Sequence, residues 1–376
     1  MSDGTIRKWG LDATIKRSCI VTLINRWPSS IEAVWQDALG GIEAAHYVID
    51  RAALRSNEHL RAAIGAMKSV AVPRSETIIA GAERSKSAAA LRRMIDWFDD
   101  KNVARRREPI IAIGGGALLD MVSFSASIYR RGVPVVKIPT TLIGIVDAAL
   151  GAKTAVNFYG RKNLVGSFHP AEAVVLEPKF MKSLPRQHIS SGVAEILKVG
   201  LAKDATLVDL LETCVESLVV DRFQTDLGSQ ILERAIDLLL ASVWSDPWET
   251  QLARDLDLGH SLSKVFEESL DPRLTHGEAV ALDMAITCAS GVRIGVITVD
   301  ELRRIESLMH RAGLPSDHSG INQAVLRRAR QDTIVHRDGS KLFPIVGPIG
   351  QISFLPLHVN ELLLAQRLLR SDKKRT

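Results

Sequence analysis

Three side chains in separate parts of the sequence, Glu195, His260 and His276, could together bind a divalent metal ion. One carboxylate and two imidazoles form the mixed ligand set that holds a catalytic zinc ion while leaving a position open to water or substrate. A histidine taken alone is more often a hydrogen-bonded structural residue. Here, however, Gly259 and Gly277 stand beside the two histidines and leave backbone room next to each ring. The sequence therefore predicts a metal site formed by distant segments.

Two lysines accompany these residues at helical spacing. Lys198 follows Glu195 by three positions and Lys264 follows His260 by four, so each lysine is expected on the same helical face as a predicted ligand. Cations that face a metal repel it unless an anion lies between them. The pattern predicts an anionic substrate such as a phosphorylated small molecule. The alternative for Lys264 is a solvated helix lysine.

A glycine turn at 114–116 follows an apolar strand expected at 109–113 and precedes a helix expected at 117–129. Glycines let backbone amides approach a pyrophosphate closely, and a helix N-terminus favours an anion. Because the spacing is not Gly-x-Gly-x-x-Gly, a simple strand-to-helix turn is the alternative. Asp50, at the end of an earlier expected strand, could accept hydrogen bonds from ribose hydroxyls and so favour NAD over NADP. Its alternative is a loop-capping role.

The elements that must position these residues divide into two kinds. Up to about residue 176, short β-rich runs alternate with amphipathic runs. This alternation is typical of a mainly parallel sheet with helices. Strands are expected at 45–50, 70–73, 77–80, 109–113, 133–138 and 173–176. Later residues show helical periodicity, with helices expected at 194–219, 226–243, 280–295 and 360–369 and a hairpin within 341–354.

The length of 376 residues exceeds the roughly 250–300 residues that one core supports. We therefore expect an α/β, Rossmann-like, NAD-binding N-terminal domain at 1–180 and a mostly α-helical, metal- and substrate-binding C-terminal domain at 181–376, with a cleft between them.

Composition excludes several classes of function. The chain is 46% hydrophobic and 24% charged, as in ordinary globular proteins, and no apolar run is long enough to span a membrane. A net charge of +5, with few aromatic residues, does not form a nucleic-acid footprint. Cys19, Cys214 and Cys288 lack the close spacing of a zinc knuckle or disulfide framework and are expected to be reduced core residues. No secretory signal is readable at the start, so a cytoplasmic location is expected.

Over roughly residues 104–295 the chain resembles the sugar phosphate cyclases, the superfamily of dehydroquinate synthase. The resemblance is carried by Gly114-Gly-Gly-Ala-Leu-Leu-Asp120, Tyr129-Arg-Arg-Gly132, Ile138-Pro-Thr-Thr141, Val146-Asp147, Gly151-Ala-Lys-Thr-Ala-Val-Asn157, Arg161-Lys-Asn163, Ala194-Glu-Ile-Leu-Lys198, Asp257-Leu-Gly-His260 and His276-Gly-Glu-Ala-Val280.

This resemblance implies a role for each matching position. It implies Zn²⁺ or Co²⁺ on Glu195, His260 and His276, and a homodimer in which Arg131 reaches a phosphate across the interface. It implies NAD contacts from Asp50, Glu83, Lys86, Gly114, Gly115, Gly116, Asp120, Thr140, Thr141, Asp147, Lys153 and Lys162. Catalytic or substrate contacts are implied for Asp120, Lys153, Asn163, Lys198, Asp257 and Lys264.

Departures from dehydroquinate synthase favour one branch of the superfamily. Asp257 and Lys264 stand where that enzyme has asparagine and a second histidine, and Leu240 and Ala253 stand where it has a lysine and an arginine that bind a carboxylate, although Arg254 is adjacent. A buried substrate carboxylate without those cations would be strongly destabilised. The substrate is therefore expected to lack one.

The chain is similar to the cyclases that act on sedoheptulose 7-phosphate, especially the 2-epi-5-epi-valiolone synthases. This similarity is carried by the segments 105–116, 118–120, 129–134 and 151–154. Their reaction implies transient oxidation by NAD, elimination of phosphate, reduction and intramolecular aldol closure to a C7 cyclitol. Alternatives within the superfamily are synthases of 2-epi-valiolone, demethyl-4-deoxygadusol or 3-dehydroquinate. A metal-dependent NAD polyol dehydrogenase and a catalytically silent scaffold are further alternatives.

Overall fold

The computed structural model of the chain describes residues 18–24, 35, 36, 39 and 41–372. The expectation about a secretory signal falls on residues outside these ranges. In the described part of the chain, no helix combines the length and apolar character needed to cross a membrane.

A six-stranded parallel sheet forms the first half of the structure. Its strand order is β1 (Ile20–Leu23), β8 (Ala173–Leu176), β5 (Val135–Pro139), β4 (Ile110–Gly114), β2 (Ala44–Asp50) and β3 (Val72–Ile79). Strands β2, β4 and β5 are buried along their whole length, as expected for parallel strands with both faces covered. The strands expected at 70–73 and 77–80 form the single edge strand β3, where Pro73 is tolerated because it lies at an edge.

Helices cover both faces of this sheet. Side chains of α3 (Glu58–Val70) pack with Tyr47, Ile49 and Ile111 on one face. Side chains of α4 (Ala88–Asp100) and α5 (Gly116–Ile128) pack with Val48 and Ala112 on the other. Alternate residues of each strand thus enter two different cores, and this layering holds the carboxyl ends of the strands in fixed positions.

The order in which the chain adds strands to the sheet reverses between the parallel strands β2 and β4. From β2 it proceeds to β3 on one side, whereas from β4 it proceeds to β5 and then β8 on the other side. In open parallel sheets, ligands bind outside the carboxyl ends of the strands at such a reversal. Here these ends are Asp50 and Gly114.

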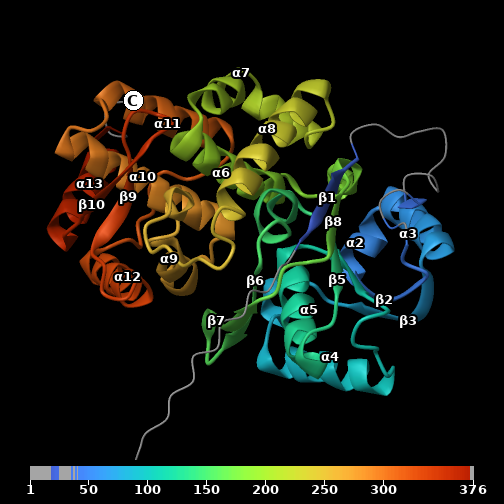
Figure 1. Cartoon of the computed structure of the whole chain (residues 1–376). Coiled ribbons are helices and arrows are strands. Elements are labelled where there is room, and N and C mark those ends of the chain that lie inside the picture. Colours follow the sequence, from blue (N-terminus) through green and yellow to red (C-terminus); the bar gives the residue numbers. More distant parts are fainter. Residues whose placement is uncertain (1–17, 25–34, 37–38, 40, 373–376) are drawn as a thin grey trace, which may run out of the picture.

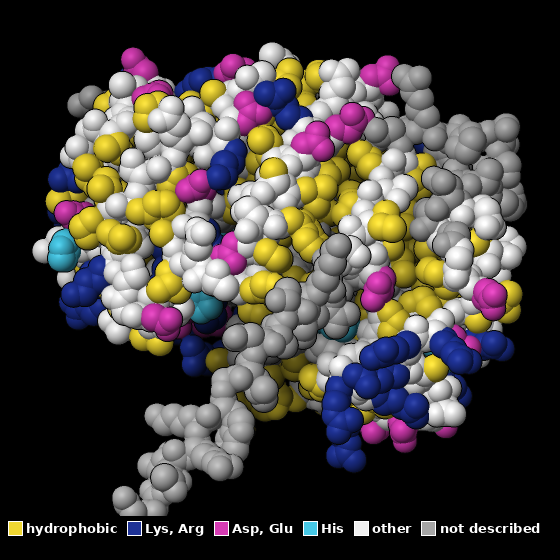
Figure 2. Space-filling view, viewed as in Figure 1, with side chains coloured by type: hydrophobic (Ala, Val, Ile, Leu, Met, Phe, Trp, Pro, Cys, Tyr) yellow, Lys and Arg dark blue, Asp and Glu magenta, His cyan; other side chains and the backbone are white. Residues whose placement is uncertain are grey.

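The second half is mainly helical and lies opposite the sheet in Figure 1. It comprises α6 (Arg186–Lys203), α7 (Ala205–Asp221), α8 (Asp226–Val243), α9 (Ser263–Ser269), α10 (His276–Ile294), α11 (Val299–Arg311), α12 (Gln323–His336) and α13 (Val359–Asp372), with a hairpin of β9 (Leu342–Val346) and β10 (Ile352–Pro356). Figure 2 shows hydrophobic side chains gathered between the two halves, and Lys and Arg side chains over α4.

Several helix boundaries differ from the expectation, and two of the differences bear on the site. The single helix expected at 194–219 is divided into α6 and α7, because Asp204 is extended and its side chain accepts a hydrogen bond from the Thr206 amide as the N-cap of α7. Helix α10 begins four residues earlier than expected, since Thr275 and Glu278 form a capping box at its start. This cap makes His276 the first residue of the helix.

A second hairpin, not expected from the sequence, joins β6 (Lys153–Phe158) to β7 (Arg161–Phe168). Tyr159 and Gly160 form its turn with φ values of 49° and 72°, the positive region that tight hairpin turns require. The hairpin packs against α5 and also meets α9 of the helical half. It therefore connects the two halves near the predicted site.

Candidate active site

The structure brings the three predicted metal ligands together. Glu195 lies in the middle of α6, His260 in the loop before α9, and His276 at the start of α10. The Nε2 atom of His276 is 3.0 Å from Oε1 of Glu195, and Nε2 of His260 is 3.7 Å from the same oxygen. One ligand atom from each residue lies within 4.8 Å of the others, which is close enough for all three to bind one ion.

Close backbone packing at glycines makes this convergence possible. A Cβ atom on Gly277 would lie 2.2 Å from the Ser191 carbonyl oxygen, so α10 can approach α6 this closely only with glycine there. A Cβ on Gly192 would lie 2.3 Å from a carbon of Leu142. Gly259, with φ of +72°, packs directly on α10. Gly277 and Gly259 thus hold the three ligand-bearing segments against one another, and Gly192 lets α6 pack on the loop after β5.

The Nδ1 atoms of both histidines, which do not face Glu195, also have fixed partners. Nδ1 of His260 is 3.2 Å from the Leu258 carbonyl oxygen, and Nδ1 of His276 is 2.9 Å from Oε1 of Glu267. Metal-binding histidines normally donate their second ring N–H to a carbonyl or a carboxylate in this way, which orients the other nitrogen toward the ion. The residues present therefore fit a divalent metal ion.

Neighbouring charges set the protonation of this cluster. Burial favours the neutral acid of Glu195, but Lys198 and the two histidines hold its pKa well below the usual range. Burial and Lys198 lower the pKa of His260 to about 4, so its ring is neutral and able to bind a metal at neutral pH. Burial acts against protonation of His276, yet Glu267 and Glu195 raise its pKa to about 10. A metal must therefore displace a proton from His276.

Asp50 lies at the carboxyl end of β2, next to the glycine turn. Its Oδ1 accepts hydrogen bonds from the Ala52 amide at 2.9 Å and the Gly81 amide at 3.4 Å, so it caps α2 (Arg51–Ser56). The capping alternative is thus confirmed. A Cβ on Gly114 would lie 3.1 Å from Cβ of Asp50, which places the aspartate beside the turn predicted to bind NAD.

The loop after β5 packs on the same glycine turn. The Thr140 amide donates to the Gly114 carbonyl at 3.0 Å, and Thr141 Oγ1 accepts from the Gly144 amide at 3.1 Å. A Cβ on Gly115 would approach Cγ2 of Thr141 to 3.1 Å. The predicted NAD-binding segments therefore form one continuous edge.

Gly116 and Asp147 extend this edge toward the metal cluster. Gly116 is the first residue of α5, and a Cβ there would lie 3.1 Å from Cβ of Ala148. Asp147 belongs to the single π-helical turn Gly144–Ala148. Burial alone would lower the pKa of Lys198, but Glu195 and Asp147 raise it. Asp147 thus acts electrostatically on the metal side of the site.

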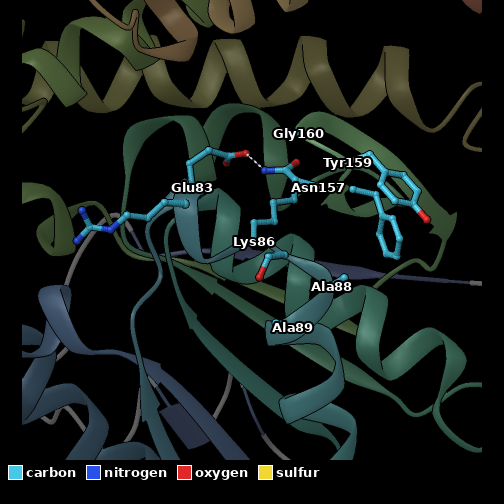
Figure 3. A pocket seen from close by; sticks show the side chains of 10 residues that line it. Glu83, Lys86, Ala88, Ala89, Asn157, Tyr159 and Gly160 are labelled. Atoms are coloured by element: carbon cyan, nitrogen blue, oxygen red, sulfur yellow. Dashed lines mark hydrogen bonds between the residues drawn. The ribbon is translucent and has the colours of Figure 1, made fainter.

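Lys86 is buried and contacts several polar side chains that are more exposed. Its Nζ contacts Oδ2 of Asp120 at 2.5 Å and also donates to Oδ1 of Asn163 on β7. Next to it, Glu83 in η1 (Glu83–Ser85) accepts a hydrogen bond from Asn157 at 2.7 Å, as Figure 3 shows. A cavity of about 430 Å³ opens here, lined by Glu83, Arg84, Lys86, Ser87, Ala88, Ala89, Asn157, Phe158, Tyr159 and Gly160. The cavity thus adjoins the predicted NAD edge.

A row of alternating charges lies along another side of the site. Lys153 Nζ is 2.8 Å from Oε1 of Glu249, which also pairs with Arg254. Arg254 in turn contacts Asp257 at 2.7 Å, and Arg337 contacts the other oxygen of Asp257 at 3.3 Å. Both oxygens of the aspartate that precedes the His260 loop are therefore paired with guanidinium groups.

Lys264 does not share a helical face with His260, so that expectation is wrong. The left-handed backbone at Gly259 keeps His260 out of the helix, and α9 begins only at Ser263. Lys264 Nζ instead pairs with Oδ2 of Asp332 on α12 at 3.1 Å. By contrast, the spacing of Lys198 worked as expected, since its ammonium lies 2.6 Å from Glu195.

Arg131 is exposed at the end of η2 (Tyr129–Arg131). Arg130, Arg131 and Gly132 all have positive φ, at 49°, 65° and 114°. Two consecutive arginines in the left-handed region are uncommon, and such strain concentrates at functional sites. A Cβ on Gly132, the next residue, would lie 3.8 Å from His169, so this turn lies beside the end of β7.

Sequence reasoning missed Glu249 and Glu267. Neither belongs to a recognisable spacing, since Glu249 lies in an irregular loop and Glu267 is nine positions before the histidine that it contacts. Glu267 stands between Phe266 and Glu268, and the sequence holds no signal that separates it from its charged neighbour.

Comparisons with known proteins match this arrangement. The family models described as 3-dehydroquinate synthase N-terminal and C-terminal match residues 76–191 and 192–334. A 2-epi-5-epi-valiolone synthase of Actinoplanes sp. is 42% identical over 70% of this chain and 68% of its own length. Another, from Actinomyces sp., is 39% identical over 78% of this chain and 79% of its own length.

A solved structure agrees with the sequence comparisons. The 2-epi-5-epi-valiolone synthase from Streptomyces hygroscopicus subsp. jinggangensis 5008, with NAD⁺ and Zn²⁺ bound, superposes with a TM-score of 0.90 at 35% identity and covers 97% of this chain and 100% of that one. The chain therefore belongs to the 3-dehydroquinate synthase family.

Proposed function

We propose that this protein is a sugar phosphate cyclase that converts sedoheptulose 7-phosphate to 2-epi-5-epi-valiolone with release of phosphate, a carbon–oxygen lyase reaction. The main observation behind this proposal is that Glu195, His260 and His276 lie close together at the edge of the sheet that holds the glycine turn. Lys198 lies beside them. The identity of about two fifths to 2-epi-5-epi-valiolone synthases supports the choice of substrate.

Each half would then hold one cofactor. Residues 1–180 would bind NAD through the edge formed by Asp50, the 114–116 turn, Thr140 and Thr141, and residues 181–376 would bind Zn²⁺ or Co²⁺. When bound, NAD accepts and returns a hydride, and the metal polarises the substrate hydroxyl that is oxidised. The protein's own task is to hold the substrate so that the carbon to be oxidised faces NAD and the oxygen on that carbon faces the metal.

The charges of the site favour a substrate that carries a phosphate and disfavour one that also carries a carboxylate. Lys198 is buried, and its ammonium would stabilise an anion placed next to the metal. Arg254 and Lys153, in contrast, are already paired with Glu249. A substrate carboxylate would have to break these pairs, so a neutral sugar chain is the better fit.

The active form would be a homodimer. The side chains of Leu164, Val165 and Phe168 on β7 are 41%, 37% and 42% exposed, and the Phe168 ring meets the 41%-exposed Trp248 edge-on at 6.0 Å. An exposed apolar strand of this kind is a natural surface for a second copy. Arg131 emerges beside it, which suits an arginine that reaches the partner's substrate.

A cytoplasmic location is part of the proposal. Cys19, Cys214 and Cys288 are all unpaired, as is usual in a reducing compartment.

Incubation with sedoheptulose 7-phosphate, NAD and Zn²⁺ or Co²⁺ tests the reaction. Inorganic phosphate should appear without net NADH, and NMR of the product should show the 2-epi-5-epi-valiolone ring. A polyol dehydrogenase would instead form NADH in step with product. Glu195→Gln serves as the inactive control. Failure to release phosphate with either metal would refute the proposed activity.

A further inference from the structure

A single buried carboxylate, that of Glu267, contacts both halves of the site. The side chain is only 5% exposed and projects from α9. Its Oε1 is 2.9 Å from Nδ1 of His276, whose other nitrogen faces Glu195. Its Oε2 pairs with Nζ of Lys162 on β7. One rigid group therefore orients a predicted metal ligand and a predicted NAD contact at once.

Lys162 is held next to α9 by its backbone as well as by its side chain. Its backbone amide donates to Oε1 of Glu268 at 3.3 Å, so the strand is held next to α9 independently of the lysine side chain. The Lys162 ammonium also lies 3.9 Å from Glu83, which borders the cavity at the NAD edge. The Lys162 ammonium therefore lies between the carboxylate of Glu267 on the metal side and that of Glu83 at the NAD edge.

We infer that Glu267 is a positioning residue that couples metal binding to NAD binding. When His276 is fixed on a metal, its N–H fixes the Glu267 carboxylate, and the carboxylate holds Lys162 in one orientation at the NAD edge. The second ligand then meets a group that is already ordered, so each ligand tightens the binding of the other by the same factor. This inference rests on the metal and NAD sites proposed above.

Binding measurements without turnover test the coupling. The dissociation constant of NAD is measured by calorimetry on the full-length protein, first stripped of metal and then loaded with Co²⁺. In the wild-type protein NAD should bind at least about 5-fold more tightly with Co²⁺ present. In Glu267→Gln this ratio should fall to nearly one, and Co²⁺ affinity should drop by about 10- to 100-fold.

Glu268→Gln is the matched control. It removes the same charge from the adjacent position, keeps an oxygen that can accept from the Lys162 amide, and does not touch His276. Both the ratio and the Co²⁺ affinity should stay at the wild-type value, and thermal unfolding checks that both variants are folded. A wild-type ratio of one, or a ratio that survives in Glu267→Gln, would overturn the coupling. A wild-type protein that binds neither NAD nor Co²⁺ would instead refute the proposed function itself.

Discussion

The Lys198 ammonium lies 2.6 Å from the Glu195 carboxylate, one turn away on the same helix, and both side chains are buried. A predicted metal ligand is thus paired with a cation of its own helix. The carboxylate is held ionised by this neighbour, as the lowered pKa of Glu195 shows. A divalent ion and Lys198 must then share one carboxylate, which leaves positive charge for a substrate anion.

Replacement of Lys198 should destabilise the protein mainly in its metal-free form. Lys198→Met leaves the buried Glu195 with the His276 ring as its cationic partner, and removing one partner of a buried pair costs up to about 3–5 kcal/mol. Saturating Zn²⁺ should restore most of the loss, because the ion supplies the missing positive charge. Urea unfolding with and without Zn²⁺ measures this. Lys203→Met, at the more exposed end of α6, should cost less than about 1 kcal/mol. Equal losses with and without metal would contradict the explanation.

His260→Ala should abolish turnover through loss of the metal while the protein remains folded. One of three ligands is removed, and the ring is partly exposed and makes only one backbone contact through Nδ1. Elemental analysis after dialysis should find less than about a tenth of the wild-type zinc. His188→Ala, an exposed histidine on α6, is the control and should retain full metal. Wild-type zinc content in His260→Ala would exclude this residue as a ligand.

Asp50→Asn separates the two roles of this residue. Asparagine caps a helix as well as aspartate does, so the bond to the Ala52 amide should survive and the thermal midpoint should change little. The loss of a charged acceptor for ribose hydroxyls should weaken NAD binding by about 10-fold, since such hydrogen bonds contribute about 1.5–3 kcal/mol. Calorimetric titration with NAD gives the result. Unchanged affinity would leave Asp50 with the capping role alone.

A mixture of two inactive variants tests whether Arg131 acts on the partner's substrate. Arg131→Ala and His260→Ala should each be inactive as pure proteins. After joint unfolding and refolding, half of the dimers contain one of each, and one of their two sites then has both residues. About a quarter of wild-type phosphate release should return if Arg131 crosses the interface. No recovery, although sedimentation shows mixed dimers, would place Arg131 in its own subunit's site, and an active pure Arg131→Ala would place it in neither.

Much of the fold and of the candidate site could be predicted from the sequence. Strands such as β4 and β5 are continuous apolar runs because both of their faces are covered, and the glycine turn after β4 marks the following helix. The metal ligands were predicted from their residue types, from Gly259 and Gly277 beside the two histidines, and from the resemblance to the sugar phosphate cyclases. Lys198 was placed correctly since it lies within one helix of known geometry, where spacing alone determines which side chains meet.

Other features depend on contacts that no local pattern encodes. The spacing of Lys264 was misleading, because His260 lies in the loop that follows the left-handed Gly259, whereas the helix that carries Lys264 begins only at Ser263. The β6–β7 hairpin has an exposed second strand with little alternation, so its existence depends on packing against α5 and α9.

The sequence by itself determined which side chains could bind a metal and a nucleotide, since residue type and local spacing fix chemical capacity. Only the tertiary structure decided their partners: Glu267 for His276 and Lys162, and Glu249 for Lys153 and Arg254. Such partners come from segments far apart in the chain. They meet where close helix packing, as at Gly277 against Ser191, brings the backbones within reach.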